Sequence, residues 1–244
     1  MFLIVKLDAI NSTNTYLKGW AKENTAVQWA VVVAKSQTAG KGQQNESWQS
    51  ESGKNLTFSI LYRFDNLPLS QQFHLNCAIS LSLYDTLLPI IGKSLTVKWP
   101  NDIMSDNKKL GGILIENTVK KGNITQSVIG VGLNVNQINF PNDLPNATSL
   151  GMISKKTYDL DKLLQSILES VKRRFELLEM KKYDTLNKVY QKTLFRRNVL
   201  SQFSDGNKIF NGKIIKVTTA GKLQIELENK TVKEFYLKEI KYIL

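Results

Sequence analysis

The sequence predicts an α+β protein: a mixed, largely antiparallel sheet flanked by helices, followed by a small C-terminal β-barrel. Three observations support this class. The strand-like segments between Leu95 and Leu133 are joined by turns too short for a crossover helix, which makes neighbouring strands antiparallel. Two long segments repeat apolar residues every three or four positions, as one-sided helices do. After Arg197 the pattern changes to short strands separated by turn residues, so we divide the chain into residues 1–196 and 197–244.

The N-terminal part mixes strands and helices. The small polar residues of Asn11–Asn14 suit the start of a helix. Val31–Ala34 is a short β-branched run, which predicts a buried strand. Asn55–Tyr62 alternates apolar and polar residues, which predicts a half-buried strand. A polar loop containing glycine connects these two strands.

A helix is expected after Pro68, with Ser70 as its N-terminal cap. Its apolar face is formed by residues at helical spacing, namely Phe73, Cys77, Leu81, Tyr84 and Leu88. His74 lies on the same helix, and we expect it at the surface. Cys77 is expected to act as a small buried apolar residue.

Turn signals divide the next stretch into hairpins. Leu95–Trp99 reads as a strand that ends at Pro100, and Ser105–Asn107 forms a second turn before the strand Leu110–Glu116. A third turn precedes the strand Ile124–Leu133. Asp159 can cap a long helix, and Tyr183–Phe195 predicts a second one; the expected tail strands are Lys208–Val217, Leu223–Leu227 and Thr231–Leu237.

Composition fits a folded soluble protein, because apolar residues make up 42% and charged residues 22% of the 244 residues. No apolar run reaches the roughly 18 residues needed to cross a bilayer. The single cysteine rules out a disulfide framework, so we expect a cytoplasmic protein that does not bind membranes. The net charge of +12 favours anionic partners, although a lysine-rich composition explains it equally well. The lysines are scattered and no nucleic-acid-binding motif is present, so a nucleic-acid-binding module is only an alternative.

The loop from Gln37 to Trp48 has the composition of an anion-binding loop. Gly40 and Gly42 allow the backbone to approach a ligand, and Lys41 adds positive charge. Trp48 offers a flat face for a base. A flexible polar connection is the alternative, and the spacing fits neither the Walker nor the Rossmann motif.

Two neighbouring segments, Lys98–Asp102 and Lys109–Glu116, could stabilise charge. A hairpin across Ser105–Asn107 would bring Lys109 back towards Asp102. Asp102 can orient a lysine or bind Mg²⁺ through water, and a lysine there can stabilise charge that develops during adenylyl transfer. The paired glycines that follow Lys109 leave room for a ligand, or else mark a β-bulge.

Five segments, in this order, resemble the biotin–protein ligase family: S-T-N at Ser12–Asn14, Q-T-A-G-K-G at Gln37–Gly42, K-W-P-N-D at Lys98–Asp102, K-L-G-G-I-L-I-E at Lys109–Glu116, and G-x-G-x-N-x-N at Gly130–Asn136. The resemblance implies a catalytic fold related to class II aminoacyl-tRNA synthetases and an SH3-like C-terminal domain. It also implies that ATP, with Mg²⁺, activates biotin as biotinyl-5'-AMP. The biotinyl group would then pass to a lysine of a biotin carboxyl carrier domain.

The resemblance also implies residue roles. The expected catalytic residues are Lys109 and Asp102. The expected biotin-binding residues are Ser12, Thr13, Asn14, Gln37, Gly40, Lys41, Gly42 and Gly112, the last of which also borders the nucleotide. The expected nucleotide-binding residues are Lys41, Gln43, Trp48, Asn101, Lys109 and Asn134. The pattern identifies no metal ligand directly.

The loop departs from the family pattern G-R-G-R-x-G-R-x-W. We interpret Lys41, Gln43, Asn45 and Ser47 as replacements of Arg, Arg, Gly and Arg, which would change how the adenylate is held. The catalytic motifs begin at Ser12, so we expect no winged-helix domain, no specific DNA binding and no transcriptional role. A monomer or a homodimer is expected. A lipoate or octanoate ligase of the same fold is the nearest alternative function.

Overall fold

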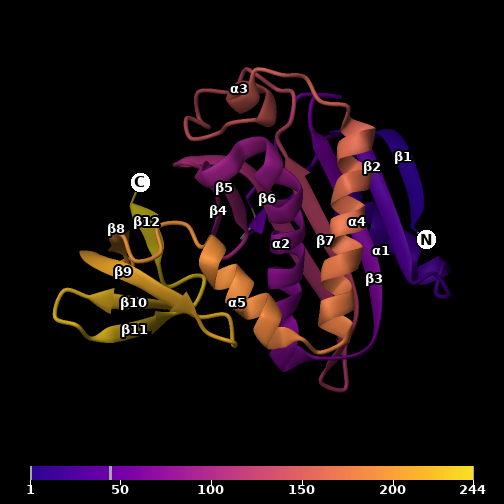
Figure 1. Ribbon diagram of the computed structural model, residues 1–244. Coiled ribbons are helices and arrows are strands. Elements are labelled where there is room, and N and C mark those ends of the chain that lie inside the picture. Colours follow the sequence, from indigo (N-terminus) through magenta and orange to yellow (C-terminus); the bar gives the residue numbers. More distant parts are fainter. Residues whose placement is uncertain (1, 44–45, 244) are drawn as a thin grey trace.

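The computed structural model describes residues 2–43 and 46–243. Its main sheet has seven strands in the order β1-β2-β3-β7-β6-β5-β4 (Figure 1). The bounds of these strands are β1 Leu3–Ile10, β2 Trp29–Gln37, β3 Leu56–Pro68, β4 Leu95–Lys98, β5 Asp102–Ser105, β6 Lys108–Lys120 and β7 Asn123–Leu133. Only β1 and β2 pair in parallel, while the other pairs are antiparallel. The prediction of a mixed, largely antiparallel sheet is therefore confirmed.

Helices cover both faces of this sheet. α2 (Gln72–Ile91) and α4 (Leu160–Glu179) lie side by side on one face, and α5 (Tyr183–Thr193) packs against α2 (Figure 1). α1 (Thr13–Glu23) covers the opposite face, where Leu17 packs against a second set of strand residues that includes Val32 and Leu61. The remaining helix, α3 (Leu150–Ser154), is short, as are the 3-10 turns Leu69–Gln71 and Gly92–Ser94.

Because both faces are covered, β3 is buried more completely than its alternating sequence predicts. All residues from Leu56 to Tyr62 are buried, including the polar Thr57 and Ser59. The prediction of a half-buried strand is therefore wrong. The polar positions of β3 face the α1 side, where the Ser59 hydroxyl is hydrogen-bonded to Thr13 and Asn14 near the functional site.

α2 is a core helix. It is the one helix in the described part of the chain that is long and apolar enough to cross a membrane, yet it is packed against the sheet, α4 and α5. Cys77 is fully buried, as predicted. His74 is also buried, which contradicts the expected surface position, because Tyr183 of α5 stacks on its ring at 4.8 Å.

One of the predicted helix caps, Asp159, is confirmed, and another, Ser70, is wrong. Asp159 caps α4 by accepting hydrogen bonds from the backbone of Asp161 and Lys162, as expected. Ser70 does not cap α2, because the chain after Pro68 first forms a 3-10 turn and α2 starts at Gln72 without a side-chain cap. Ser12 caps α1 through the backbone N–H of Thr15.

The C-terminal sheet has five antiparallel strands in the order β11-β10-β9-β8-β12. Their bounds are β8 Leu200–Ser204, β9 Ile209–Val217, β10 Leu223–Leu227, β11 Val232–Phe235 and β12 Lys241–Ile243. The sequence predicted β9, β10 and β11 but neither β8 nor β12, which are short. The sheet contacts the end of β4, where Trp99 Nε1 donates to the carbonyl of Gly221 at 3.0 Å. The division into domains 1–196 and 197–244 stays a prediction.

Candidate active site

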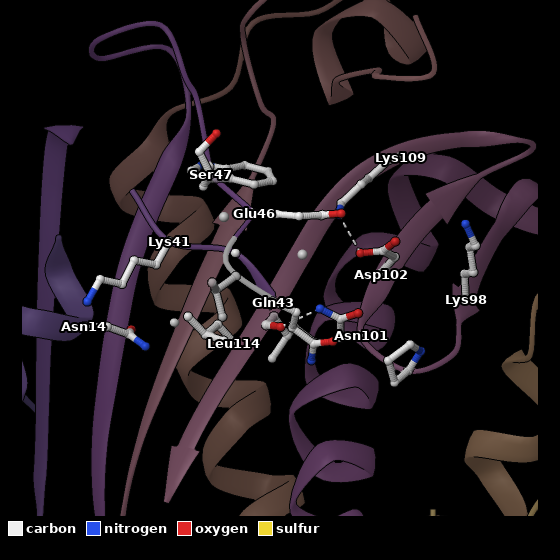
Figure 2. A pocket seen from close by; sticks show the side chains of 18 of the residues that line it. Asn14, Lys41, Gln43, Glu46, Ser47, Lys98, Asn101, Asp102, Lys109 and Leu114 are labelled. Carbon is white, nitrogen blue, oxygen red and sulfur yellow. Dashed lines mark hydrogen bonds and ion pairs between the residues drawn. The ribbon is translucent and has the colours of Figure 1, made fainter. Parts of the chain in front are cut away.

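A cavity of about 420 Å³ opens on the α1 side of the main sheet and reaches the C-terminal sheet. It gathers residues from four of the five segments that the sequence singled out and from the start of the fifth. Of the candidate residues, those that line it are Ser12, Thr13, Asn14, Gln37, Lys41, Gly42, Gln43, Trp48, Asn101, Asp102, Lys109 and Gly112. Gly40 and Asn134 do not line it. Figure 2 shows part of this lining.

One end of the cavity is a connected polar network. The backbone N–H and the hydroxyl of Thr13 both donate to Gln37 Oε1, at 2.7 and 3.0 Å. The Ser59 hydroxyl lies 2.7 Å from Thr13 Oγ1 and 2.5 Å from Asn14 Oδ1. Asn14 Nδ2 donates to Glu116 at 2.8 Å. Such a network holds several hydrogen-bonding groups in fixed directions at the start of α1.

Two glycines of β7 make this packing possible. A Cβ atom on Gly130 would lie 2.5 Å from Asn14 Oδ1. A Cβ on Gly132 would overlap the indole ring of Trp48. The G-x-G spacing therefore has a structural cause, because alternate residues of one strand face the same side. The two glycines seat Asn14 and Trp48 directly on the strand.

The loop that ends at Trp48 is a tight hairpin. The backbone N–H of Trp48 donates to the carbonyl of Gly40 at 3.0 Å, and that of Gly42 donates to the carbonyl of Glu46 at 2.6 Å. A side chain at Gly40 would collide with the Trp48 carbonyl, so Gly40 closes the loop although it does not line the cavity. Gln44 and Asn45 lie outside the described residues, so the expectation for Asn45 has no structural counterpart here.

The loop pattern needs one correction. Counting G-R-G-R-x-G-R-x-W from Gly40 places Glu46, and not Ser47, at the third arginine. The departure at this position is thus a reversal of charge. Glu46 lines the cavity, and in Figure 2 its carboxylate points towards the ammonium group of Lys109.

Lys109 and Asp102 form an ion pair at the centre of the cavity, with Nζ 2.7 Å from Oδ1. The β5–β6 hairpin places them there, which confirms the predicted return of Lys109 towards Asp102. The backbone of Lys109 is fixed on its other side, where its N–H donates to Asn146 and its carbonyl accepts from Thr148, at 2.6 and 2.9 Å. Gly112 lies beside the pair, and a Cβ there would meet the Lys109 side chain only at 3.4 Å.

Two asparagines support the Lys109–Asp102 pair through hydrogen bonds to the neighbouring backbone. Asn101 Nδ2 donates to the carbonyl of Ile113 at 2.8 Å, and the backbone N–H of Ile113 donates back to the carbonyl of Asn101 at 3.0 Å. Asn134 is buried, and its Nδ2 donates to the carbonyl of Thr148 at 3.0 Å. Because Thr148 in turn binds the backbone of Lys109, Asn134 supports Lys109 indirectly.

Sequence reasoning missed two groups of lining residues. Lys98 belongs to a recognised motif but received no role, and its ammonium lies over the ring of Tyr242, 4.9 Å from the ring centroid. Burial lowers the pKa of Lys98 from its ordinary value, and the nearby carboxylate of Asp102 partly opposes that change. The second group is the C-terminal segment Leu237–Tyr242, of which Leu237, Lys238, Ile240, Lys241 and Tyr242 line the cavity. No local sequence signal marks such a long-range contact.

The charge of the cavity suits a polyanionic ligand. Its lining contains five lysines but only two carboxylates, Asp102 and Glu46; the lysines are Lys41, Lys98, Lys109, Lys238 and Lys241. Within residues 2–43 and 46–243, no group of three or more His, Cys, Asp or Glu side chains could hold a metal ion. The cavity therefore fits a phosphate-bearing molecule better than a metal bound by protein ligands alone.

Comparison with known proteins places these features in one family. The model of the biotin/lipoate A/B protein ligase family matches residues 7–134. The bifunctional ligase/repressor BirA of Bacillus spizizenii is 28% identical over 240 residues, which cover 97% of this chain and 73% of that protein. The biotin–[acetyl-CoA-carboxylase] ligase of Mycobacterium tuberculosis is 30% identical over 168 residues, 67% of this chain and 60% of that protein.

Solved structures agree with this family assignment. The biotin protein ligase from Aquifex aeolicus, in complex with biotin and ATP, superposes with a TM-score of 0.81. The alignment covers 99% of this chain and 98% of that chain at 25% identity. It therefore includes both the seven-stranded and the five-stranded sheet. With a family match over more than half of its length, the chain belongs to the biotin/lipoate A/B protein ligase family.

Proposed function

We infer that the chain is an ATP-dependent biotin–protein ligase, which forms biotinyl-5'-AMP and transfers the biotinyl group to a lysine of a carrier protein. The observation that carries this inference is the cavity. It joins a fixed polar network to a lysine–aspartate pair in a chain that aligns end to end with a ligase solved with biotin and ATP.

The polar network favours biotin over lipoate. The ureido ring of biotin has two N–H donors and a carbonyl acceptor, whereas the dithiolane ring of lipoate has neither. Thr13, Asn14 and Gln37 line one end of the cavity with hydroxyl and amide groups, and the buried Ser59 behind them is hydrogen-bonded to Thr13 and Asn14. A ligand ring that carries N–H and C=O groups can exchange further hydrogen bonds with this network, whereas an apolar ring cannot. We propose that this end binds the ureido ring.

In the first reaction, a carboxylate oxygen of biotin attacks the α-phosphorus of ATP. The bond from that phosphorus to the bridging oxygen breaks, and pyrophosphate leaves with the electron pair. Lys109 lies where it can neutralise both the carboxylate and the α-phosphate, and Asp102 holds its ammonium in place at 2.7 Å. No protein nucleophile is needed, because positioning and neutralisation of charge suffice.

In the second reaction, the neutral amine of a carrier lysine attacks the acyl carbon of biotinyl-5'-AMP. The bond from that carbon to the phosphate oxygen breaks, AMP leaves, and the amine loses a proton. A biotin carboxyl carrier domain is the proposed partner, and the basic cavity rim fits an acidic surface on it. The cavity walls would shield the mixed anhydride from water before the carrier binds.

The loop and its neighbours are assigned to the ligands. Gly40, Lys41 and Gly42 would surround the carboxylate and phosphate, with Gly112 leaving room beside Lys109. Trp48, seated on Gly132, would lie against the adenine. Gln43 and Asn101 line the cavity and would border the nucleotide, while Asn134 would act through Thr148.

Mg²⁺ is the proposed companion of ATP. The cavity offers it two carboxylates at most, Asp102 and Glu46, and Asp102 is already paired with Lys109. Mg²⁺ commonly keeps several waters and binds through one or two carboxylates together with substrate phosphates, so the residues present fit it as a ligand of bound ATP. When bound, it would neutralise phosphate charge.

A cytoplasmic location and the absence of membrane binding are proposed, since α2 belongs to the core. The absence of specific DNA binding and a monomeric or homodimeric state stay predictions.

Exchange of labelled pyrophosphate into ATP tests the proposed function. Biotin should support exchange, whereas lipoate and octanoate should not. Exchange with lipoate alone, or with none of the three acids, would contradict the inference.

A further inference from the structure

Lys98 is a cation of the cavity that the reaction described above does not use. It lies at the end of β4, directly across from Asp102 of β5. Asp102 already pairs with Lys109, and no described carboxylate forms an ion pair with Lys98. Two lysines thus flank one aspartate, while Arg196 adds a further positive charge and Glu46 a second negative charge nearby. Three cations against two carboxylates leave this end of the cavity with a net positive charge, which suits an anionic ligand.

The position of Lys98 along the cavity indicates which anion binds beside it. Figure 2 shows Asn14 at one side, the Lys109–Asp102 pair further along, and Lys98 beyond that pair. If biotin lies at the Asn14 end, its carboxylate approaches the α-phosphorus from that side. In such displacements the attacking and leaving oxygens are roughly in line, so pyrophosphate leaves on the opposite side. That side is where Lys98 lies.

The C-terminal sheet holds Lys98 in place. The ring of Tyr242 lies 4.9 Å from the Lys98 ammonium, within the range of a cation–π contact. The neighbouring Trp99 is fixed by its bond to Gly221 of the same sheet. The Tyr242 hydroxyl is buried without a described partner, so the ring and not the hydroxyl is the part of Tyr242 that acts on Lys98.

We propose that Lys98 binds the β- and γ-phosphates of ATP and the departing pyrophosphate, and that Tyr242 of the C-terminal sheet positions it for this role. The inference rests on the proposed function. Breaking the bond between the α-phosphorus and the bridging oxygen leaves additional negative charge on pyrophosphate, and Lys98 neutralises it. Carrier biotinylation releases AMP and no pyrophosphate. Lys98 therefore serves adenylation only, whereas Lys109 serves both reactions.

The two reactions can be measured separately. Biotin-dependent pyrophosphate exchange reports adenylation, and single-turnover transfer from added biotinyl-5'-AMP to a purified carrier domain reports the second step. Lys98→Met should slow exchange by about 100-fold, as expected for loss of one group that neutralises developing charge, and should weaken inhibition by free inorganic pyrophosphate. Transfer from biotinyl-5'-AMP should stay within about twofold of the wild type. Equal losses in both reactions, or unchanged exchange, would overturn the proposal.

Tyr242 variants supply a second test that does not depend on Lys98→Met folding. Tyr242→Leu should lower exchange by about 5- to 30-fold, the equivalent of a cation–π contact of 1–2 kcal/mol, and leave transfer unchanged. Tyr242→Phe keeps the ring and should restore exchange. If Tyr242→Phe is as slow as Tyr242→Leu, the positioning role is wrong.

The C-terminal sheet offers a matched control. Lys222 lies over the ring of Tyr236 at 4.7 Å, and neither residue lines the cavity. Tyr236→Leu breaks this comparable contact in the same sheet and should leave exchange unchanged. A loss equal to that of Tyr242→Leu would mean that both act by destabilising the sheet, which overturns the proposal. A wild-type enzyme without biotin-dependent exchange would instead contradict the proposed function itself.

Discussion

Gly132→Ala is a substitution whose effect the structure predicts through one named contact. The added methyl would overlap the indole of Trp48, with two ring carbons at 2.5 and 2.6 Å. Carbon atoms in ordinary contact are about 3.5–4.0 Å apart, so the Trp48 ring must move away from Gly132. The three atoms nearest to the new methyl all belong to the Trp48 ring.

The expected loss of binding free energy for ATP equals the stacking energy between adenine and Trp48. Stacking of a base on an aromatic side chain contributes about 1–3 kcal/mol. Gly132→Ala should therefore raise the KM for ATP about 5- to 150-fold in biotin-dependent exchange, with a small effect on the KM for biotin. Gly19→Ala is the control, because its methyl meets nothing within 4 Å on α1. It should leave both constants unchanged and stabilise the helix by about 0.5–1 kcal/mol.

A double-mutant cycle identifies the cause. In a Trp48→Ala background the ring that the methyl of Gly132→Ala would overlap is gone, so the substitution should add no further loss. The coupling energy should then equal the full effect of Gly132→Ala in the wild type. Independent, additive losses would refute the reasoning, as would a Gly132→Ala enzyme with an unchanged KM for ATP.

Three further predictions concern the catalytic pair, the ligand space and the core. Lys109→Ala should reduce exchange by about 10²–10³-fold. The unfolding free energy of this variant should fall by only about 1 kcal/mol, because the pair with Asp102 is partly exposed. Unchanged exchange would exclude Lys109 from the reaction. Gly112→Ala should fold normally, since its methyl finds the Lys109 side chain at 3.4 Å, but should raise the KM for biotin, measured by exchange. Burial lowers the pKa of His74 more than nearby Asp184 raises it, so the unfolded chain takes up a proton on His74 before the folded protein does. The contribution of His74 to the unfolding free energy should therefore be constant above about pH 6.5 and fall below it, by at most about 1.4 kcal/mol per pH unit. Urea unfolding should show a weaker acid dependence in His74→Leu. An identical dependence in the two proteins would contradict this role of His74.

The sequence predicted the parts of the site that are local in the chain. Lys109 returns to Asp102 because a short turn joins their strands, and turn residues are visible in a sequence. Gly130 and Gly132 were singled out in the sequence as part of the segment G-x-G-x-N-x-N. Their specific partners, Asn14 and Trp48, became evident only from the packed structure.

Features that depend on distant segments could not be predicted. His74 looked like an exposed polar residue of a helix, and only stacking by Tyr183, more than a hundred positions away, explains its burial. Ser59 joined the polar network because α1 covers that face of β3. Similarly, Tyr242 reaches Lys98 through the docking of one sheet on the other, which no local pattern encodes.

Biotinylation of a carrier is the decisive assay for the proposed ligase activity. Purified enzyme, ATP and Mg²⁺ would be incubated with a biotin carboxyl carrier domain in the presence of equal biotin and lipoate, and the carrier would be analysed by intact mass. A biotin–protein ligase should add a single biotinyl group, and should add none when the target lysine of the carrier is replaced by arginine. An unmodified carrier, or one that carries a lipoyl group, would contradict the proposed activity.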